Sequence, residues 1–266
     1  MLDLAQSSFS GHETFAFRFG WLPKGVRAVE KAPTIFSDEQ AMVALGVGKN
    51  MVRSIRHWCV TARLLEAADD SPRAQALRLT ELGRLLLSDH DGQDRYLEDP
   101  GSLWLLHWLI CTNPTRATTW RWAFGYWSQT EFTREGMVEE LLGLVGRKGN
   151  SRANRQSLDR DVETFLHTYV TPKVAKGGVI EDTLDCPLVE LRLVRRDELT
   201  DRFEFVRGPK PSLPNSTLGF AVLDFWERFA PDQESLSFET LLYGEESPGR
   251  VFRLTETALA ERIEPV

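Results

Sequence analysis

The first ninety residues carry short apolar stripes separated by tight turns. Residues 9–29 mix aromatic and charged positions ahead of a short helical pattern, which is typical of an ordered arm. Ser37 can cap a helix over 38–45, and the Gly-Val-Gly turn at 46–48 precedes a longer helix that begins near Lys49. Two helices joined by a tight turn predict a helix-turn-helix, an arrangement suited to reading DNA.

The second of these helices has one apolar face and one cationic face. Its apolar positions recur at three- and four-residue steps and are Met51, Val52, Ile55, Cys59 and Ala62. The opposite side carries Lys49, Arg53, Arg56 and Arg63. A strand, a threonine cap and an amphipathic helix follow within 76–87, so we expect a winged helix over residues 30–90.

The middle of the chain predicts a helical domain rich in tryptophan. Its apolar segments at 103–110 and 120–127 come after a polar, acidic break at 91–100. The segment 147–160 is predicted to be a cationic loop, in which Ser157 caps the next helix. The buried stripe of that helix is predicted to be Leu158, Val162, Phe165, Leu166 and Tyr169.

Beyond Cys186 the periodicity changes from helical to alternating. Residues 188–196 and 202–208 alternate on either side of a turn and predict a β-hairpin. Two helices are expected over 216–229 and 235–242, and a strand followed by a helix over 249–263.

The end of the chain resembles its first winged segment. The pattern of an apolar residue, Arg-Leu-Thr and an amphipathic helix occurs at both 77–87 and 252–263. This repeated pattern has two interpretations. It indicates either a second winged-helix-like unit or only the common local sequence of a strand, a helix cap and a helix.

Together these patterns predict a mainly α fold with small β elements, an α+β protein in three parts. Residues 1–100 form the arm and a winged-helix-like domain. Residues 101–185 form the tryptophan-rich helical domain with its cationic loop. Residues 186–266 form the hairpin and the second winged-helix-like unit.

Composition narrows the class of protein. With 32 Lys and Arg against 39 Asp and Glu, the 266 residues carry a net charge of −7, so DNA binding has to come from local basic faces. The widely spaced Cys59, Cys111 and Cys186 predict neither a zinc site nor a disulfide framework. We expect a cytoplasmic protein without a signal peptide, because the longest apolar run, 103–110, is too short to cross a membrane.

The first candidate site is the cationic face of the second helix. Helical spacing would let guanidinium and ammonium groups follow phosphates while Asn50 reaches a base edge. The residues of this DNA-binding hypothesis are Lys49, Asn50, Arg53, Arg56 and His57. The alternative is a solvated helix face with no ligand.

The second candidate is the cationic segment. Gly149 and Asn150 would let the backbone bend round a phosphate while arginines approach it, and such binding would be strongly salt-dependent. Its cationic residues are Arg147, Lys148, Arg152, Arg155 and Arg160. The alternative is a mobile surface loop.

The third candidate is the motif SGHETF at 10–15. His12 could act as a general base, and Glu13 could bind a metal or orient the imidazole. The competing interpretation is a capping or interdomain hydrogen bond. A nuclease needs carboxylates that bind metal or activate water, and no convincing set stands out: Asp185 and Glu190 are too close in sequence to serve.

Other cofactors are not indicated. The remaining histidines show no i, i+4 pair and are expected to be structural. The segment GVGKN at 46–50 lacks the strand and the Lys-Ser/Thr order of a phosphate loop, so we expect neither a nucleotide nor an organic cofactor.

Four blocks of the sequence, 9–25, 45–59, 96–114 and 158–170, resemble a bacterial family labelled only as a domain of unknown function, and SPGRVFRL at 247–254 also resembles it. That family contains the SspB-like DNA-nicking component of Ssp-type DNA phosphorothioation systems, which act in phage defence. The resemblance implies double-stranded DNA as substrate and a phosphorothioation ATPase, a sulfurtransferase-like enzyme and a cysteine desulfurase as partners. A nick would open the backbone so that sulfur can replace a non-bridging oxygen.

If this chain is a nicking endonuclease, Mg²⁺ or Mn²⁺ is the expected cofactor, and four residues are the first candidates for a base or a metal ligand. They are His12, Glu13, Asp159 and Asp161. Two other readings stay open: a DNA-binding adaptor without catalysis, and a structural subunit whose winged helices bind protein. A symmetric dimer is the default expectation for assembly.

Overall fold

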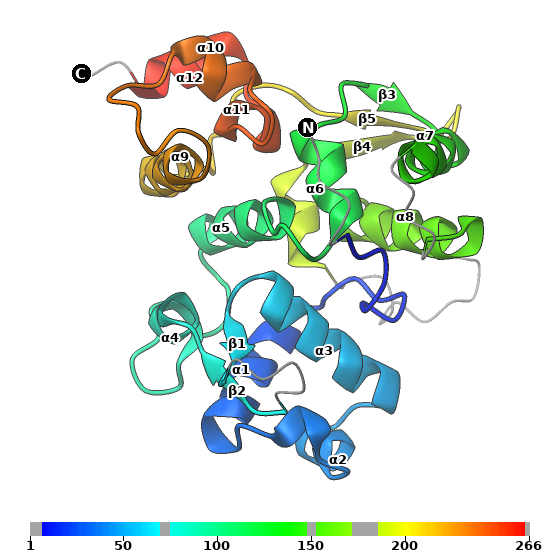
Figure 1. The fold of residues 1–266 in the computed structure, drawn as a ribbon, viewed down its shortest axis with the longest axis vertical. Coiled ribbons are helices and arrows are strands. Elements are labelled where there is room, and N and C mark those ends of the chain that lie inside the picture. The colour runs from blue at the N-terminus through cyan, green and yellow to red at the C-terminus, as the bar shows by residue number, and fades with distance from the viewer. Residues whose placement is uncertain (1–6, 70–74, 148–152, 172–185, 264–266) are drawn as a thin grey trace.

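The computed structural model describes residues 7–69, 75–147, 153–171 and 186–263 (Figure 1). Helices dominate and strands are short, so the predicted α+β class with mainly α content is confirmed. The N-terminal elements are α1 (Trp21–Lys31), η1 (Ile35–Ser37), α2 (Ala41–Leu45), α3 (Lys49–Thr61), β1 (Leu65–Ala67), β2 (Leu77–Leu79) and α4 (Glu81–Leu87).

The helix pair, strand β2 and helix α4 follow one another in the order that the sequence predicts, but α2 begins only at Ala41 and is not capped by Ser37, and strand β1 was not predicted. Gly46 takes a left-handed conformation, with φ of 63°, and ends α2 just before α3. Strands β1 and β2 pair antiparallel, with Glu66 opposite Arg78. Thr80 caps α4 through its side chain, which accepts a hydrogen bond from the Gly83 amide. A helix pair followed by a small hairpin and a helix is therefore present.

The remaining elements build the middle and C-terminal parts. In the middle lie α5 (Pro100–Cys111), α6 (Thr118–Gly125), β3 (Glu131–Phe132), α7 (Arg134–Arg147) and α8 (Arg155–Tyr169). Next come η3 (Pro187–Leu191), β4 (Val194–Asp197) and β5 (Arg202–Phe205). The chain then forms α9 (Asn215–Phe229), α10 (Phe238–Tyr243), α11 (Pro248–Val251) and α12 (Glu256–Ile263).

One sheet joins the middle part to the C-terminal hairpin. Strand β5 lies between β3 and β4, and both pairings are antiparallel. The hairpin is shorter than predicted, because residues 187–191 form the 3-10 helix η3, which buries Leu188 and Leu191. The expectation of a strand over 188–193 is therefore wrong.

The strand expected at 252–254 is also wrong. This segment is a turn after α11, in which Leu254 donates its amide hydrogen to the Gly249 carbonyl. Phe252 is fully buried and meets Trp104 of α5 edge to face, with ring centroids 5.6 Å apart. The side chains here fill the core instead of pairing with a neighbouring strand, so the described C-terminal unit lacks the wing that the repeated pattern predicts.

A continuous hydrophobic core runs through the molecule and is centred on α5, which is buried on nearly every side. The N-terminal arm crosses this core between α3 and α8 (Figure 1). Its backbone is fixed where the Trp58 indole donates a hydrogen bond to the Phe15 carbonyl, over 2.9 Å. Residues of the arm are thereby held against helices that come much later in the sequence.

Candidate functional site

A pocket of about 500 Å³ lies where the arm, the start of α3 and the start of α8 meet. Its wall is the loop 9–14, and the other lining residues are Asn50, Ser157 and Arg160. The three candidate sites of the sequence therefore each contribute to one place: the SGHETF motif, the second helix of the helix pair and the cationic segment. We call this place the arm pocket.

His12 uses both ring nitrogens for internal hydrogen bonds. The Thr14 amide donates to Nδ1 over 3.1 Å, so this nitrogen carries the lone pair. Nε2 then carries the hydrogen and donates it to Asp161 Oδ1 over 2.6 Å. With the ring buried and no free lone pair, this arrangement favours the hydrogen-bonding interpretation of the motif over a general base at His12.

Asp161 is equally occupied. Its second oxygen accepts a hydrogen bond from the Thr119 hydroxyl of α6, and its side chain is 1% exposed. The carboxylate therefore has no oxygen turned toward solvent or toward a ligand. Its contacts tie the arm to α8 and α6 at once, so Asp161 fixes the shape of the loop that forms the arm pocket.

The loop fixed in this way has an unusual backbone. Glu13 and Thr14 have φ of 50° and 66°, which is the left-handed region, and Gly11 has φ of 107°. A β-branched residue such as Thr14 rarely occupies that region, and such positions cost about 1 to 3 kcal/mol each. Because strained backbone persists only where surrounding contacts enforce it, the hydrogen bonds of His12 supply that enforcement.

Glu13 is the acidic side chain that lines the arm pocket. Its side chain is 32% exposed, and its nearest cation is Arg53, whose Nη1 lies 3.8 Å from Oε1. An exposed pair at this distance is weak. The carboxylate thus remains available to a ligand, in contrast to that of Asp161.

The predicted cationic face of α3 is exposed to solvent only at the N-terminal end of the helix. Lys49, Asn50 and Arg53 are exposed and Arg56 is half-buried. His57 is 4% exposed and lies under Gly11 of the arm, where a Cβ would stand 2.6 Å from its Nδ1. The DNA-contacting role predicted for His57 is therefore incompatible with this structure, because the arm covers that side of the helix.

The cationic segment is only partly a loop. Helix α7 extends to the exposed Arg147, and α8 already begins at Arg155, so the predicted loop over 147–160 is too long. Helix α8 is capped by Asn154 and not, as predicted, by Ser157. Ser157 is the partner of Asn154 in a capping box. Lys148 and Arg152 lie outside the described residues, as do Gly149 and Asn150.

Two of the candidate residues at the start of α8 form ion pairs with α7. Arg155 pairs with Glu139 of α7 over 2.5 Å, and Asp159 pairs with Arg134 over 3.4 Å. These pairs leave Asp159 outside the arm pocket. Arg160 is exposed and lines the pocket, and it has no carboxylate partner among the described residues.

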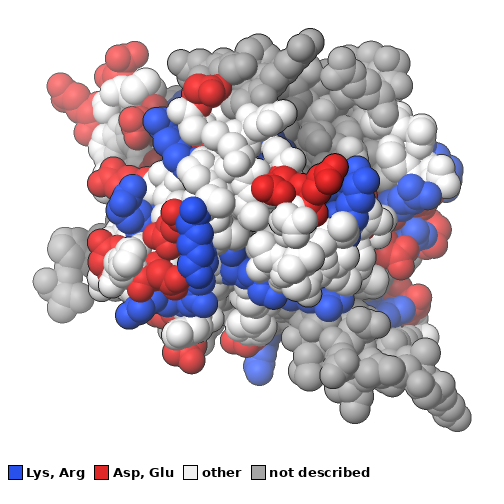
Figure 2. Space-filling model, turned by 90° about the horizontal axis from the view of Figure 1, so that it is seen from below, with Lys and Arg blue, Asp and Glu red and all other residues white. Residues whose placement is uncertain are grey.

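Figure 2 shows the underside of the molecule, where basic and acidic side chains lie next to one another. Positive charge on this face is therefore interrupted by negative charge, in keeping with the net charge of −7. Sequence analysis did not identify one basic residue near α3, which is Arg116. It lies in the turn between α5 and α6, and its pKa is lowered by burial and by the charge of Arg56. Isolated arginines in turns give no pattern that sequence analysis can detect.

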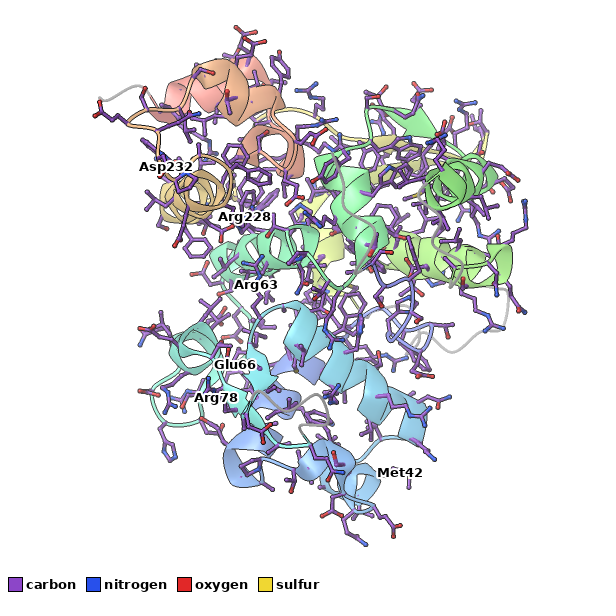
Figure 3. The ribbon with its side chains drawn as sticks, in the orientation of Figure 1. Met42, Arg63, Glu66, Arg78, Arg228 and Asp232 are labelled. Carbon is purple, nitrogen blue, oxygen red and sulfur yellow. The ribbon has the colours of Figure 1, made fainter. Side chains whose placement is uncertain are left out.

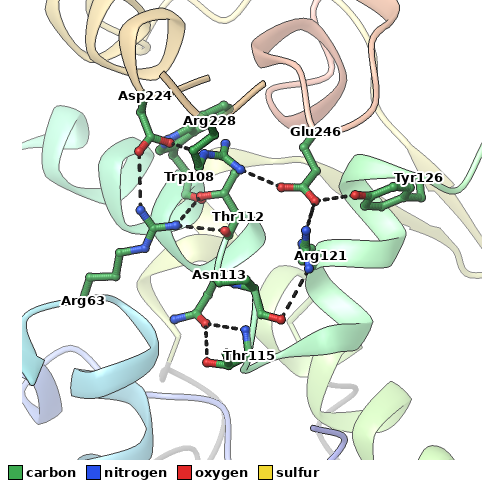
Figure 4. Close-up of polar contacts among 11 residues, drawn as sticks. Arg63, Trp108, Thr112, Asn113, Thr115, Arg121, Tyr126, Asp224, Arg228 and Glu246 are labelled. Carbon is green, nitrogen blue, oxygen red and sulfur yellow. Dashed lines mark hydrogen bonds and ion pairs between the residues drawn. The ribbon is translucent and has the colours of Figure 1, made fainter. Parts of the chain in front are cut away.

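A separate polar cluster joins three parts of the chain (Figure 4). Arg63, the last cation of the predicted α3 face, contacts Asp224 of α9 instead of solvent, at 3.5 Å. Figure 3 places Arg63 near Arg228, which also contacts Asp224, at 3.0 Å. Arg228 in turn pairs with the fully buried Glu246 over 2.8 Å. Each carboxylate of this cluster contacts at least one of its arginines, so we assign the cluster to structure.

His107 confirms the structural role expected of the scattered histidines. Its Nδ1 lies 2.9 Å from the Tyr169 hydroxyl and its Nε2 lies 2.9 Å from the Val251 carbonyl. Burial lowers its pKa to about 3. Within the part of the chain that the structure describes, no three His, Cys, Asp or Glu side chains gather as a metal site.

The two buried histidines predict a loss of stability in mild acid. Burial, followed by the electrostatic effect of the neighbouring His12, lowers the pKa of His57 to about 3, against 6.5 in an unfolded chain. Between these values the unfolded state binds more protons, so the free energy of unfolding falls as the pH drops below about 6.5. Above that pH the histidines add no pH dependence.

Urea unfolding at pH 6.5 and pH 5 measures this effect. We expect the loss of stability over this interval to be smaller by about 2 kcal/mol in His57→Leu than in the wild type, since one proton-linked group has gone. His90→Gln, at an exposed position, is the matched control. An unchanged acid loss in His57→Leu would show that His57 is not held neutral in the folded protein.

Comparison with known proteins places the chain among related sequences. Residues 9–266 match the family described as a protein of unknown function, DUF4007. The fold is similar to the structure titled "Magnesium ion-bound SspB crystal structure", with a TM-score of 0.86 and 34% identity over 99% of this chain and 79% of the other. A second structure, titled "SspB crystal structure", gives 0.85 and 35% over 97% and 78%. No curated protein matches the sequence.

One further property concerns membranes. Among the described residues, no helix combines the length and the apolar character that crossing a bilayer requires.

Proposed function

Because this chain belongs to the DUF4007 family and is similar in fold to SspB, we propose that it is the DNA-nicking component of an Ssp-type DNA phosphorothioation system. The observation that carries the proposal is the arm pocket. It combines one available carboxylate, Glu13, with Asn50 at the start of α3 and with Arg160 of α8, which pairs with no carboxylate in the described part of the chain. Acid, amide and cation are the groups that a site for phosphodiester chemistry needs.

DNA binding in this proposal rests on the edge of the pocket. Lys49 and Arg53 are exposed beside it, and Arg160 faces it from α8. Because the rest of the molecule is acidic, these contacts carry the attraction to phosphates, and the affinity should fall steeply with salt. Asn50 is the side chain placed to meet a base edge.

The chemistry in this proposal belongs to Glu13. A phosphodiester is hydrolysed when a water loses a proton as it attacks phosphorus and the developing negative charge is stabilised. Glu13 can accept that proton, while Arg160 stabilises the charge on the phosphate. His12 and Asp161 act as positioning residues, since their hydrogen bonds hold the left-handed turn that presents Glu13.

A magnesium ion is compatible with these residues. Mg²⁺ binds proteins through one or two carboxylates and completes its shell with water and substrate phosphate oxygens. Glu13 provides the carboxylate, and the side-chain oxygens of Ser10 and Asn50 line the same pocket. When bound, the ion would neutralise charge on the phosphate and lower the pKa of a bound water.

Conversion of supercoiled plasmid to open circle tests the proposal. With the purified protein we expect nicking that needs added Mg²⁺ or Mn²⁺ and stops with a chelator. The nick would then give the sulfurtransferase-like enzyme, supplied by the cysteine desulfurase and assisted by the ATPase, access to the backbone. Plasmid that stays supercoiled at high protein concentration contradicts the catalytic part of the proposal.

A second function is favoured by one observation. Since His12 and Asp161 are both occupied by internal hydrogen bonds, a DNA-binding adaptor that presents sites to the modification enzymes fits the pocket as well. The adaptor would bind DNA with the same residues but leave plasmid intact under every metal condition. Binding without nicking therefore distinguishes it.

Arg160 provides a binding test that is independent of chemistry. We expect Arg160→Ala to weaken binding to a short duplex by about tenfold and to reduce the slope of log affinity against log salt by about 1, because one phosphate contact is lost. Fluorescence anisotropy over a salt series measures both. The control is Arg195→Ala, which removes an exposed cation of β4 paired with Glu204. Equal behaviour of the two variants would remove Arg160 from the interface.

A further inference from the structure

We infer that Arg56 and Arg116 form a second oxyanion subsite beside the arm pocket and hold a backbone phosphate of the bound DNA. The inference rests on the proposed function, because it needs DNA as ligand. Neither guanidinium makes a hydrogen bond or an ion pair within the described parts of the chain, and each is half-buried. The two lie close enough for the charge of Arg56 to disfavour that of Arg116.

The turn that carries Arg116 is fixed by hydrogen bonds of the Asn113 side chain. The Asn113 carboxamide oxygen accepts hydrogen bonds from the amides of Thr115 and Arg116, both over 3.1 Å. Its amide group donates to the Thr61 carbonyl at the end of α3, over 2.9 Å. The next residue, Ala117, has φ of 50°. The fold therefore fixes Arg116 next to α3 through a buried asparagine and a strained backbone.

Beneath the pair lies a third unsatisfied group. His57 is buried, neither of its ring nitrogens has a hydrogen-bond partner among the described residues, and it lies within the electrostatic reach of Arg56 and Arg116. The two guanidinium groups, which have no carboxylate partner in the described part of the chain, disfavour each other's charge, and the neutral imidazole offers no negative charge to compensate them. An anion with several oxygen atoms would supply that negative charge.

The position of the subsite indicates which anion it takes. Gly11 lines the arm pocket and also contacts the His57 ring. Gly11 therefore links the arm pocket to His57, whose electrostatic neighbours include Arg56 and Arg116. A nucleic-acid strand whose reacting phosphate sits at Glu13 would bring another phosphate to Arg56 and Arg116. The chemistry is that of a phosphate oxyanion, and we assign its source to DNA.

Duplex binding by Arg56→Ala, Arg116→Ala and the double variant tests the assignment. Each single variant is expected to bind about tenfold more weakly and to lower the salt slope by about 1. Because both arginines hold one phosphate, the double variant should lose clearly less than the product of the two single effects. Arg116→Lys should retain part of the affinity, and Arg195→Ala should behave as the wild type.

The competing outcomes separate the subsite from the proposed function. Wild-type affinity in Arg116→Ala, with Arg160→Ala weakened, would overturn the subsite and leave the proposed function intact. If the wild type binds no DNA, the proposed function fails. Thermal unfolding in inorganic phosphate and in chloride at equal ionic strength then tests whether the two arginines still bind an oxyanion. A phosphate stabilisation lost in Arg116→Ala supports an oxyanion subsite without DNA, and no stabilisation overturns it.

Discussion

Replacing Glu13 with glutamine is expected to reduce plasmid nicking by at least about a hundredfold, while binding to DNA stays as tight as in the wild type or becomes tighter. The amide keeps the size of the side chain but cannot accept a proton from water, and general-base catalysis contributes about 10² to 10⁴ in rate. The loss of a negative charge 3.8 Å from Arg53 frees that arginine for phosphate. The effect therefore falls on the rate of the chemical step and not on affinity.

The measurement is a time course of open-circle formation at saturating protein, together with duplex binding by anisotropy. Glu139→Gln is the matched control, since it neutralises an exposed carboxylate of α7 that pairs with Arg155 away from the pocket. Rates that are equal in Glu13→Gln and the wild type would exclude Glu13 from the chemistry and leave the adaptor function as the better proposal.

Removing the Glu246 carboxylate should produce the largest loss of stability in the molecule. Glu246→Ala is expected to lower the free energy of unfolding by about 3 to 5 kcal/mol, since breaking one side of a buried ion pair leaves uncompensated charge. The carboxylate is fully buried and accepts hydrogen bonds from Arg121, from Arg228 over 2.8 Å and from the Tyr126 hydroxyl over 2.6 Å (Figure 4).

Urea unfolding at neutral pH measures this change. Glu204→Ala is the control, because it breaks an exposed pair with Arg195 that should contribute no more than about 1 kcal/mol. If Glu246→Ala loses as little as the control, the middle and C-terminal parts of the chain, which meet at this carboxylate, are held together by apolar packing alone.

Patterns of short range were predictable from the sequence. The stripe predicted for the helix after the cationic segment, from Leu158 to Tyr169, is buried at each of its five positions. Thr80 caps α4 as expected, because a cap depends only on the neighbouring backbone. Helical periodicity and capping are local properties, so the sequence alone determined these elements.

Tertiary contacts explain what sequence analysis missed. His12 and Asp161 are 149 positions apart, and no local pattern links them. His57 has the spacing of a cationic face, yet the arm covers it. Helix α12 follows Thr255 as predicted. Residues 252–254, in contrast, pair with no strand in the described structure and pack into the core. A strand needs a neighbour, whereas a helix satisfies its own backbone.

The hydrogen bond between the arm and α8 has a consequence for the order in which the protein matures. An N-terminal fragment that stops before α8 already contains the helix pair and Glu13, but it lacks the carboxylate that fixes the turn around Glu13. Under the proposed nicking function, a nascent chain on the ribosome would therefore lack a positioned Glu13 until the second half of the polypeptide has emerged and α8 has packed against the arm.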